Sequence, residues 1–115
     1  MIATLKIASS DGALLICPAV FAELHAYPGA TAAFLRQMVS DFGVFIDYQI
    51  DSRVWSEAGQ RFAAYSERRR VGRGDSPRRL LTDFFIGAHA LVQADRLLTL
   101  DKGIYQRNFP ELALF

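Results

Sequence analysis

The sequence predicts an α/β fold of three layers, with a mostly parallel sheet between helices. Short apolar segments alternate along the chain with longer segments of helical periodicity, which is typical of strand–helix–strand units. The apolar segments are short and continuous, as in buried strands. The chain has 115 residues, a common length for one domain, so we expect residues 1–115 to form a single domain.

The composition is that of an ordinary globular protein. Hydrophobic residues make up 51%, charged residues 22%, and the net charge is +1, so chain-wide disorder is not expected. The single cysteine, Cys17, excludes an internal disulfide and lies in an apolar run, which predicts a small core residue. No apolar stretch approaches the roughly 20 residues of a membrane helix. Without a secretory signal pattern, we expect a cytoplasmic protein.

The first half of the chain is expected to contain three helices and two strands. Pro18 suits the first turn of a helix, because the N–H group that it lacks has no helical partner there. Pro28-Gly29 and Gly43 mark breaks between elements. The expected elements are helices at 2–9, 18–27 and 30–42 and strands at 13–17 and 44–46.

The second half is expected to begin with a long helix that Asp51 or Ser52 caps and that ends near residue 69. Its predicted apolar face carries Val54, Trp55, Ala58, Phe62 and Tyr65. The later expected elements are a helix from Pro77 to about residue 93, a strand at 96–100, a loop or short helix at 102–108 and a short strand at 112–115.

Glu23 is the first of three carboxylates in unusual positions. On the predicted helix it falls beside Val20, Leu24 and Tyr27, on the apolar face. A carboxylate there is costly unless it is paired or bound to a cation. The alternative is a carboxylate at the rim of the core that accepts a hydrogen bond from a backbone N–H.

Asp83 is the second carboxylate. It lies within the apolar arc of the helix from Pro77, whereas His89 falls on the polar side. The alternative is an ion pair with Arg79, one turn before it.

Asp101 is the third carboxylate, directly after the strand predicted at 96–100. Ligand sites of open α/β sheets form at this edge of the sheet. The alternative is a turn aspartate before Lys102-Gly103.

Together the three acids predict a metal-dependent site. If they meet in one pocket, their like charges require a cation. Hard oxygen ligands suit Mg²⁺ or Mn²⁺. Such an ion lowers the pKa of a bound water and holds a phosphate ester in line, which is the chemistry of a phosphodiesterase or nuclease.

Three motifs carry a resemblance to a known family. Residues 16–24 (ICPAVFAEL), 81–91 (LTDFFIGAHAL) and 97–105 (LLTLDKGIY), with 108–112 (NFPEL) after them, resemble the second, third and fourth motifs of PIN domains of the VapC toxin type. Their order and separation also match, and the resemblance covers about residues 12–115.

The resemblance implies a PIN-like, Rossmann-type fold and a function. Glu23, Asp83 and Asp101 would be the catalytic, metal-binding acids for Mg²⁺ or Mn²⁺, and Thr99 would support the last of them. The activity would be that of an endoribonuclease hydrolase, the toxin of a type II toxin–antitoxin (VapBC) system. Its partners would be an RNA substrate, a small antitoxin protein and a second copy in a homodimer.

The sequence departs from the family at its start. PIN domains begin with a central strand that ends in a metal-binding aspartate, and no such segment precedes the motifs here. We therefore expect the fold to lack the first central strand and most of the first helix, and a natural protein that begins upstream of Met1. Because the first acid is missing, the alternative function is a catalytically inactive PIN-like module that binds an antitoxin or RNA.

A basic segment precedes the Asp83 helix. Such a cluster can hold RNA phosphates or an acidic antitoxin segment, and the alternative is a solvated loop. The candidate binding residues are Arg68, Arg69, Arg70, Arg73, Arg78 and Arg79.

Overall fold

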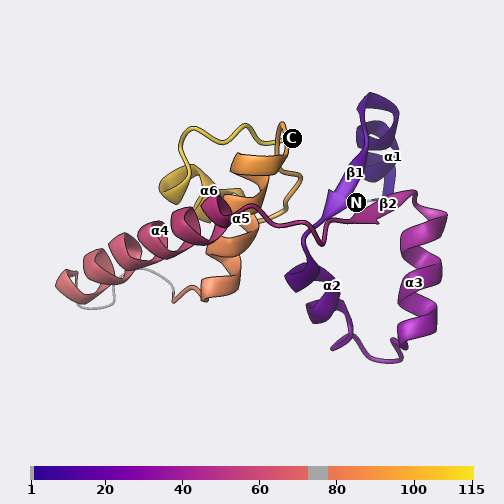
Figure 1. Cartoon of the computed structure of the whole chain (residues 1–115), viewed down its shortest axis with the longest axis horizontal. Helices are drawn as coiled ribbons and strands as arrows, with labels where there is room; N and C mark the ends of the chain where they lie inside the picture. Colours follow the sequence, from indigo (N-terminus) through magenta and orange to yellow (C-terminus); the bar gives the residue numbers. More distant parts are fainter. Residues whose placement is uncertain (1, 73–77) are drawn as a thin grey trace. The chain divides into compact units, whose positions relative to one another are not determined.

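The computed structural model describes residues 2–72 and 78–115 (Figure 1). The chain forms two compact units, Met1–Gln49 and Ile50–Phe115. The described residues form a mostly helical α/β structure with a two-stranded parallel sheet. The α/β class is thus confirmed in this coarser form, whereas the PIN-like identity and the single domain stay predictions.

The first unit contains five elements of the predicted types, in the predicted order. Thr31 caps the third helix, since its hydroxyl accepts a hydrogen bond from the Phe34 N–H at 3.1 Å. Gly43 follows that helix with φ of 65°, a conformation that glycine adopts without the steric cost of a side chain. The elements are α1 (Ile2–Asp11), β1 (Leu14–Ile16), α2 (Pro18–Leu24), α3 (Ala32–Asp41) and β2 (Val44–Ile46).

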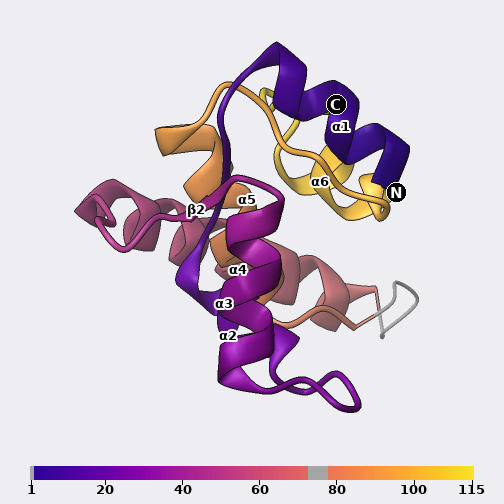
Figure 2. The ribbon, with the colours of Figure 1, turned by 90° about the vertical axis from the view of Figure 1, so that its right-hand side faces the viewer.

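The sheet of the first unit consists of β1 and β2, paired in parallel. Leu14 pairs with Val44 and Ile16 with Ile46. Parallel neighbours need a crossover connection, and α2 and α3 provide it (Figure 1). Figure 2 shows α3 along its length. Cys17 follows β1 directly and is buried, as predicted.

The second unit is built around α4 (Ser52–Val71), α5 (Leu81–Gln93) and α6 (Lys102–Asn108). Helices α4 and α5 pack against each other (Figure 1). Asp51 caps α4, as predicted, because its carboxylate accepts a hydrogen bond from the Arg53 N–H at 2.8 Å. The helix therefore starts where the sequence places it.

An aromatic cluster forms the core of the second unit. Phe84 of α5 is fully buried, and its ring centroid lies 5.3 Å from Phe62, 5.2 Å from Tyr65 and 6.1 Å from Phe109. Phe109 follows α6 and is fully buried too. Side chains from α4, α5 and the end of α6 thus share one core.

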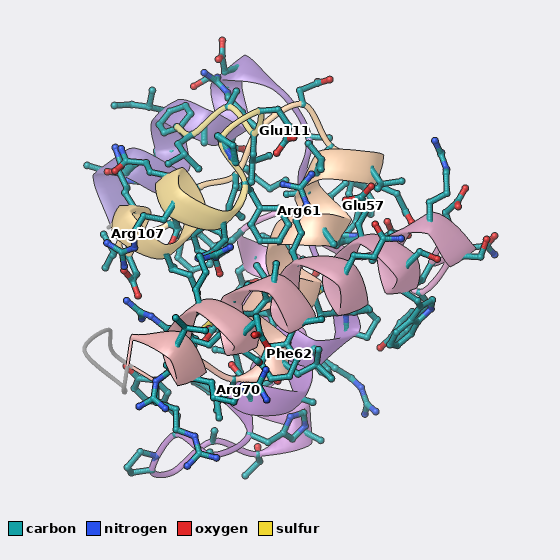
Figure 3. All side chains as sticks on the ribbon, turned by 90° about the vertical axis from the view of Figure 1, so that its left-hand side faces the viewer. Glu57, Arg61, Phe62, Arg70, Arg107 and Glu111 are labelled. Carbon is teal, nitrogen blue, oxygen red and sulfur yellow. The ribbon has the colours of Figure 1, made fainter. Side chains whose placement is uncertain are left out.

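Arg61 of α4 contacts Asn108 and Glu111 near the end of the chain (Figure 3). Its guanidinium forms ion pairs with Glu57 and Glu111 and donates to the Asn108 carbonyl at 2.9 Å. The same group lies over the Phe109 ring, 4.7 Å from its centroid. A charged side chain at the rim of an apolar core is tolerated when it is paired in this way.

The predicted strand at 96–100 is wrong as a regular strand. Within the described residues, this region and the strand expected at 112–115 meet only in an isolated parallel bridge between Leu97 and Leu114. Two hydrogen bonds of 2.9 Å flank it, from the Leu97 N–H to Ala113 and from the Phe115 N–H to Leu97. Leu100 is 82% exposed, so the apolar run is not buried along its length.

The helix predicted from Pro77 starts later than expected. Pro77 lies outside the described residues, residues 78–80 are not helical, and α5 begins at Leu81. The Asp83 carboxylate accepts a hydrogen bond from the Leu80 N–H at 3.1 Å. An acid in the first turn that binds the preceding N–H fixes the start of a helix.

Two placements on helix faces also need correction. His89 was predicted on the polar side of its helix but is buried, 4% exposed, since α5 is covered over most of its circumference. Trp55 was predicted on the apolar face of α4 but is 61% exposed. Its ring still packs against Phe85, with centroids 4.5 Å apart.

Candidate functional site

Asp101 lies in a short turn that Thr99 stabilises. The Asp101 backbone N–H donates to the Thr99 hydroxyl oxygen at 3.1 Å, and α6 begins directly after Asp101. The threonine therefore orders the backbone of the acid rather than its carboxylate. Whether Thr99 supports a catalytic site stays a prediction.

The carboxylate of Asp101 forms an ion pair with Arg79. Arg79 Nη1 lies 2.6 Å from Asp101 Oδ2. The Arg79 side chain is 22% exposed and that of Asp101 is 54% exposed, so the pair lies at the surface of the second unit, with the guanidinium as its more buried partner. The arginine thus pairs with Asp101, whereas the sequence suggested Asp83.

The backbone of Arg79 is anchored to α4. Its N–H donates to the Tyr65 hydroxyl oxygen at 2.7 Å, and Tyr65 is buried. This contact involves only the backbone of Arg79, so it holds the segment before α5 against α4 in any rotamer of the arginine side chain. Among the described residues, Arg79 Nε is buried and has no hydrogen-bond partner.

Asp83 lies in the first turn of α5 and is half-buried. Its carboxylate accepts a hydrogen bond from the Leu80 N–H, which lies one residue after Arg79. The Arg79–Asp101 contact therefore brings the turn before α6 against the segment that leads into the Asp83 helix. Two of the three candidate acids thus belong to neighbouring segments of one unit.

Glu23 belongs to the first unit, on α2. It is exposed, α2 has no buried residue, and Tyr27 beside it is 73% exposed. The inference that Glu23 faces a core is therefore wrong, because the apolar residues around it are not buried. Whether Glu23 meets the other two acids stays a prediction.

The donor chemistry of the second unit suits a hard divalent ion, but its donors are few. Asp83 and Asp101 offer carboxylate oxygens, the ligands that Mg²⁺ and Mn²⁺ prefer. Over residues 2–72 and 78–115, neither unit by itself holds a group of three or more His, Cys, Asp or Glu side chains arranged for a metal ion. The second unit alone therefore provides only part of the expected ligand set.

The arginines of the basic segment do not form one uniform surface. Arg68 donates from Nη2 to Asn108 Oδ1 at 2.5 Å, and Arg70 pairs with Glu67. Arg78 is exposed, and Arg73 lies outside the described residues. Arg68, Arg69 and Arg70 make the last turn of α4 basic. Whether it binds RNA or an antitoxin stays a prediction.

Sequence reasoning missed the contacts that organise this region. Arg61 and Arg68 both reach Asn108, which ends α6, and the Tyr65 hydroxyl holds the Arg79 backbone. The partners lie 40 or more residues apart for the first two contacts. The one sequence signal was Tyr65, whose hydroxyl group is polar although the residue lies on the predicted apolar face of α4.

None of the helices in the described part of the chain combines the length and the apolar character that a membrane crossing needs. Comparison of the sequence with protein-family models and with curated proteins, and comparison with solved structures, finds no match.

Proposed function

We propose that this chain is a metal-dependent endoribonuclease of the PIN type, resembling the VapC toxin of a type II toxin–antitoxin system. One observation carries the proposal: the Arg79–Asp101 ion pair joins the turn of Asp101 to the segment that leads into the Asp83 helix. Two carboxylates from separate motifs are thereby held on neighbouring segments. Carboxylate oxygens are the ligands that Mg²⁺ and Mn²⁺ prefer, and such ions activate water for attack on phosphodiesters.

The local geometry of both acids supports the proposal. Thr99 orders the turn before Asp101, and the first turn of α5 holds Asp83 through the Leu80 N–H. Asp101 is exposed and Asp83 is half-buried, so neither residue is closed off from solvent. A bound Mg²⁺ or Mn²⁺ would activate a water molecule for attack on the phosphodiester. Glu23 is proposed as a further ligand.

The partners follow from the same proposal. The basic turn of α4 that contains Arg68, Arg69 and Arg70 would attract the RNA backbone by releasing its counterions. An acidic segment of a small antitoxin could bind the same arginines. We further propose a homodimer and a cytoplasmic location, as the resemblance to VapC-type toxins implies.

Removal of the carboxylates tests the proposal. Asp83→Asn and Asp101→Asn should each abolish RNA cleavage in Mg²⁺ or Mn²⁺, because an amide is a much poorer ligand for a hard cation. The matched control is Asp41→Asn, the same chemical change on an exposed residue of α3, which should cleave as the unchanged chain does. Circular dichroism would verify that each variant is folded, and EDTA should stop cleavage. Cleavage that persists in both site variants would refute the proposal.

A catalytically inactive PIN-like module that binds an antitoxin or RNA is the second candidate. The Asp101 carboxylate already pairs with a cation of its own chain, Arg79, and the described residues of the second unit contain no group of three or more His, Cys, Asp or Glu side chains arranged for a metal ion. An inactive module would bind RNA or an acidic peptide in EDTA, with loss of affinity in an Arg69→Gln variant, and would cleave no RNA at any metal concentration. Metal-dependent cleavage would exclude this candidate.

A further inference from the structure

We infer that one side of the second unit, formed by α4 and α5, binds an acidic amphipathic helix of a partner protein. The surface is named the Trp55 face after its most exposed residue. It consists of neighbouring side chains from the two helices: Trp55, Phe62, Leu81 and Phe85. It excludes both candidate acids of the second unit, so the inference goes beyond the proposed nuclease and does not depend on it.

Ring contacts and helical spacing make the Trp55 face continuous. The Trp55 ring packs on Phe85 of α5, with centroids 4.5 Å apart. Phe62 lies two turns after Trp55 on the same side of α4, and its ring centroid is 5.3 Å from that of Phe84, which precedes Phe85 in the chain. Leu81 lies one turn before Phe85, so these two side chains are neighbours on the surface of α5. One apolar surface therefore includes residues of both helices.

The Trp55 face is exposed where a core surface would be covered. Trp55 is 61% exposed and Leu81 is 52% exposed, while Phe62 is half-buried. The Trp55 ring rests on the buried Phe85, so it loses little conformational freedom when a partner covers it. Ordered tryptophans of this kind contribute much of the binding energy of protein interfaces.

A row of residues extends the Trp55 face along α4. The residues that follow helical spacing on this side of the helix are Trp55, Gly59, Phe62, Ser66 and Arg69. The row is apolar at its start and basic at its end, and it contains no carboxylate. It is about 21 Å long, the length of a helix of roughly 15 residues.

Arg70 adds a second cation at the basic end of the row, beside Arg69. Figure 3 shows Arg70 on the same side of α4 as Phe62, whereas Arg61 lies on the other side. Arg70 pairs with Glu67, and both side chains of this pair are exposed. Exposed ion pairs contribute little net stability, so a carboxylate of a partner can take the place of Glu67.

The charge distribution favours an acidic helix over a second copy or RNA. A second copy that paired through the same row would bring no carboxylate to the arginines. RNA carries phosphates along its whole length, whereas the cations lie at one end of the row. A helix with apolar residues at positions i, i+4 and i+7 covers the apolar part of the row, and its glutamates bind the guanidinium groups at the basic end.

Binding of designed peptides to the full chain tests the inference. The acidic probe is a fluorescein-labelled helical peptide of roughly 18 residues, with leucine at positions i, i+4 and i+7 and glutamate on both flanks. The matched probe has lysine in place of every glutamate. In fluorescence anisotropy, the chain should bind the acidic peptide about tenfold more tightly than the lysine peptide, because the arginines attract one and repel the other. Binding should also shield Trp55, the single tryptophan, from quenching by acrylamide.

Substitutions assign the binding to the Trp55 face. Leu81→Ser and Trp55→Ala should each weaken the affinity for the acidic peptide about tenfold, because each removes an apolar side chain that binding would bury. The matched control is Leu100→Ser, the same change on an exposed leucine outside the face, which should leave the affinity unchanged. If Leu81→Ser does not fold, as judged by circular dichroism, Trp55→Ala provides the test.

A second pair of variants tests the basic end. Arg70→Gln should weaken the affinity for the acidic peptide about threefold, the contribution of an exposed ion pair. Arg107→Gln makes the same change on an exposed residue of α6 and should leave the affinity unchanged.

Several outcomes would overturn the inference. One is equal affinity for the two peptides, and another is an effect of Leu81→Ser and Trp55→Ala no larger than that of Leu100→Ser. A Trp55 that acrylamide fails to quench in the free chain would mean that the face is already covered. A dimer that dissociates in Trp55→Ala would identify a second copy as the occupant. A uridine oligonucleotide that shields Trp55 where the acidic peptide does not would identify RNA as the occupant.

Discussion

Substitution of Gly87 by alanine tests how tightly α5 packs against the residue that follows α6. A Cβ atom at Gly87 would lie 2.5, 2.7 and 2.8 Å from three carbon atoms of the Phe109 ring. These distances are far below an ordinary contact of about 3.5–4.0 Å. The ring is fully buried, and Phe84 and the Arg61 guanidinium lie against it, so it has little room to move aside.

The change in the free energy of unfolding of Gly87→Ala follows from two opposing effects. Overpacking of a filled core costs about 1–3 kcal/mol, and we take the upper end, about 3 kcal/mol, because the contact is short and the ring is enclosed. Alanine is better than glycine in a helix by about 1 kcal/mol. The free energy of unfolding of Gly87→Ala should therefore fall by about 2 kcal/mol.

Gly59 provides the matched control. It is exposed on α4, and a Cβ atom there would meet no atom within 4 Å, so Gly59→Ala keeps the helical gain without the steric cost. Its free energy of unfolding should rise by about 0.5–1 kcal/mol. Urea unfolding followed by the fluorescence of the single tryptophan, Trp55, reports the second unit, because this ring packs on Phe85. If Gly87→Ala were as stable as Gly59→Ala, the packing argument would be refuted.

Three further outcomes are expected. Arg61→Met should lower the free energy of unfolding by about 1–3 kcal/mol in urea, because it removes charged hydrogen bonds to Glu57, Glu111 and Asn108; an unchanged midpoint would contradict this role. The hydrogen bond from Arg61 holds the pKa of the Glu111 carboxyl below its ordinary value of 4.5. The ionised carboxylate therefore stabilises the fold above pH 4.5. This contribution is lost as the pH falls through the lower pKa of the folded state. In acid, the free energy of unfolding of Glu111→Gln should therefore depend less steeply on pH than that of the unchanged chain. The same slope in both would argue against the Arg61–Glu111 ion pair. Burial raises the pKa of the Cys17 thiol above its ordinary 9.0, so iodoacetamide should label it slowly at pH 8 and quickly after unfolding; equal rates would contradict its burial.

Local patterns predicted most elements, because their signals lie within a few residues. Pro18 begins α2, Asp51 caps α4 and Gly43 follows α3. Each of these residues acts on the backbone around it, through a fixed φ, a side-chain acceptor or a missing Cβ atom. The order of helices and of the two paired strands could therefore be read without tertiary information.

Pairing over long distances could not be predicted in the same way. The apolar run before Asp101 has the composition of a strand, yet only Leu97 pairs, with Leu114. Whether an apolar segment forms a ladder depends on a partner at hydrogen-bonding distance along its length, and no local signal encodes that partner. The burial of His89 also depends on tertiary structure, because α5 is covered over most of its circumference.

For the candidate site, the sequence by itself determined which residues have the right chemistry: the carboxylates of Asp83 and Asp101 and the hydroxyl of Thr99. Only the tertiary structure decided their partners. Thr99 binds the backbone of Asp101, and Arg79 pairs with Asp101 rather than with Asp83. Spacing of four residues favoured Asp83 as the partner. The Tyr65 hydroxyl on α4 anchors the backbone of Arg79 before α5 begins, and from that position its guanidinium reaches the turn before α6.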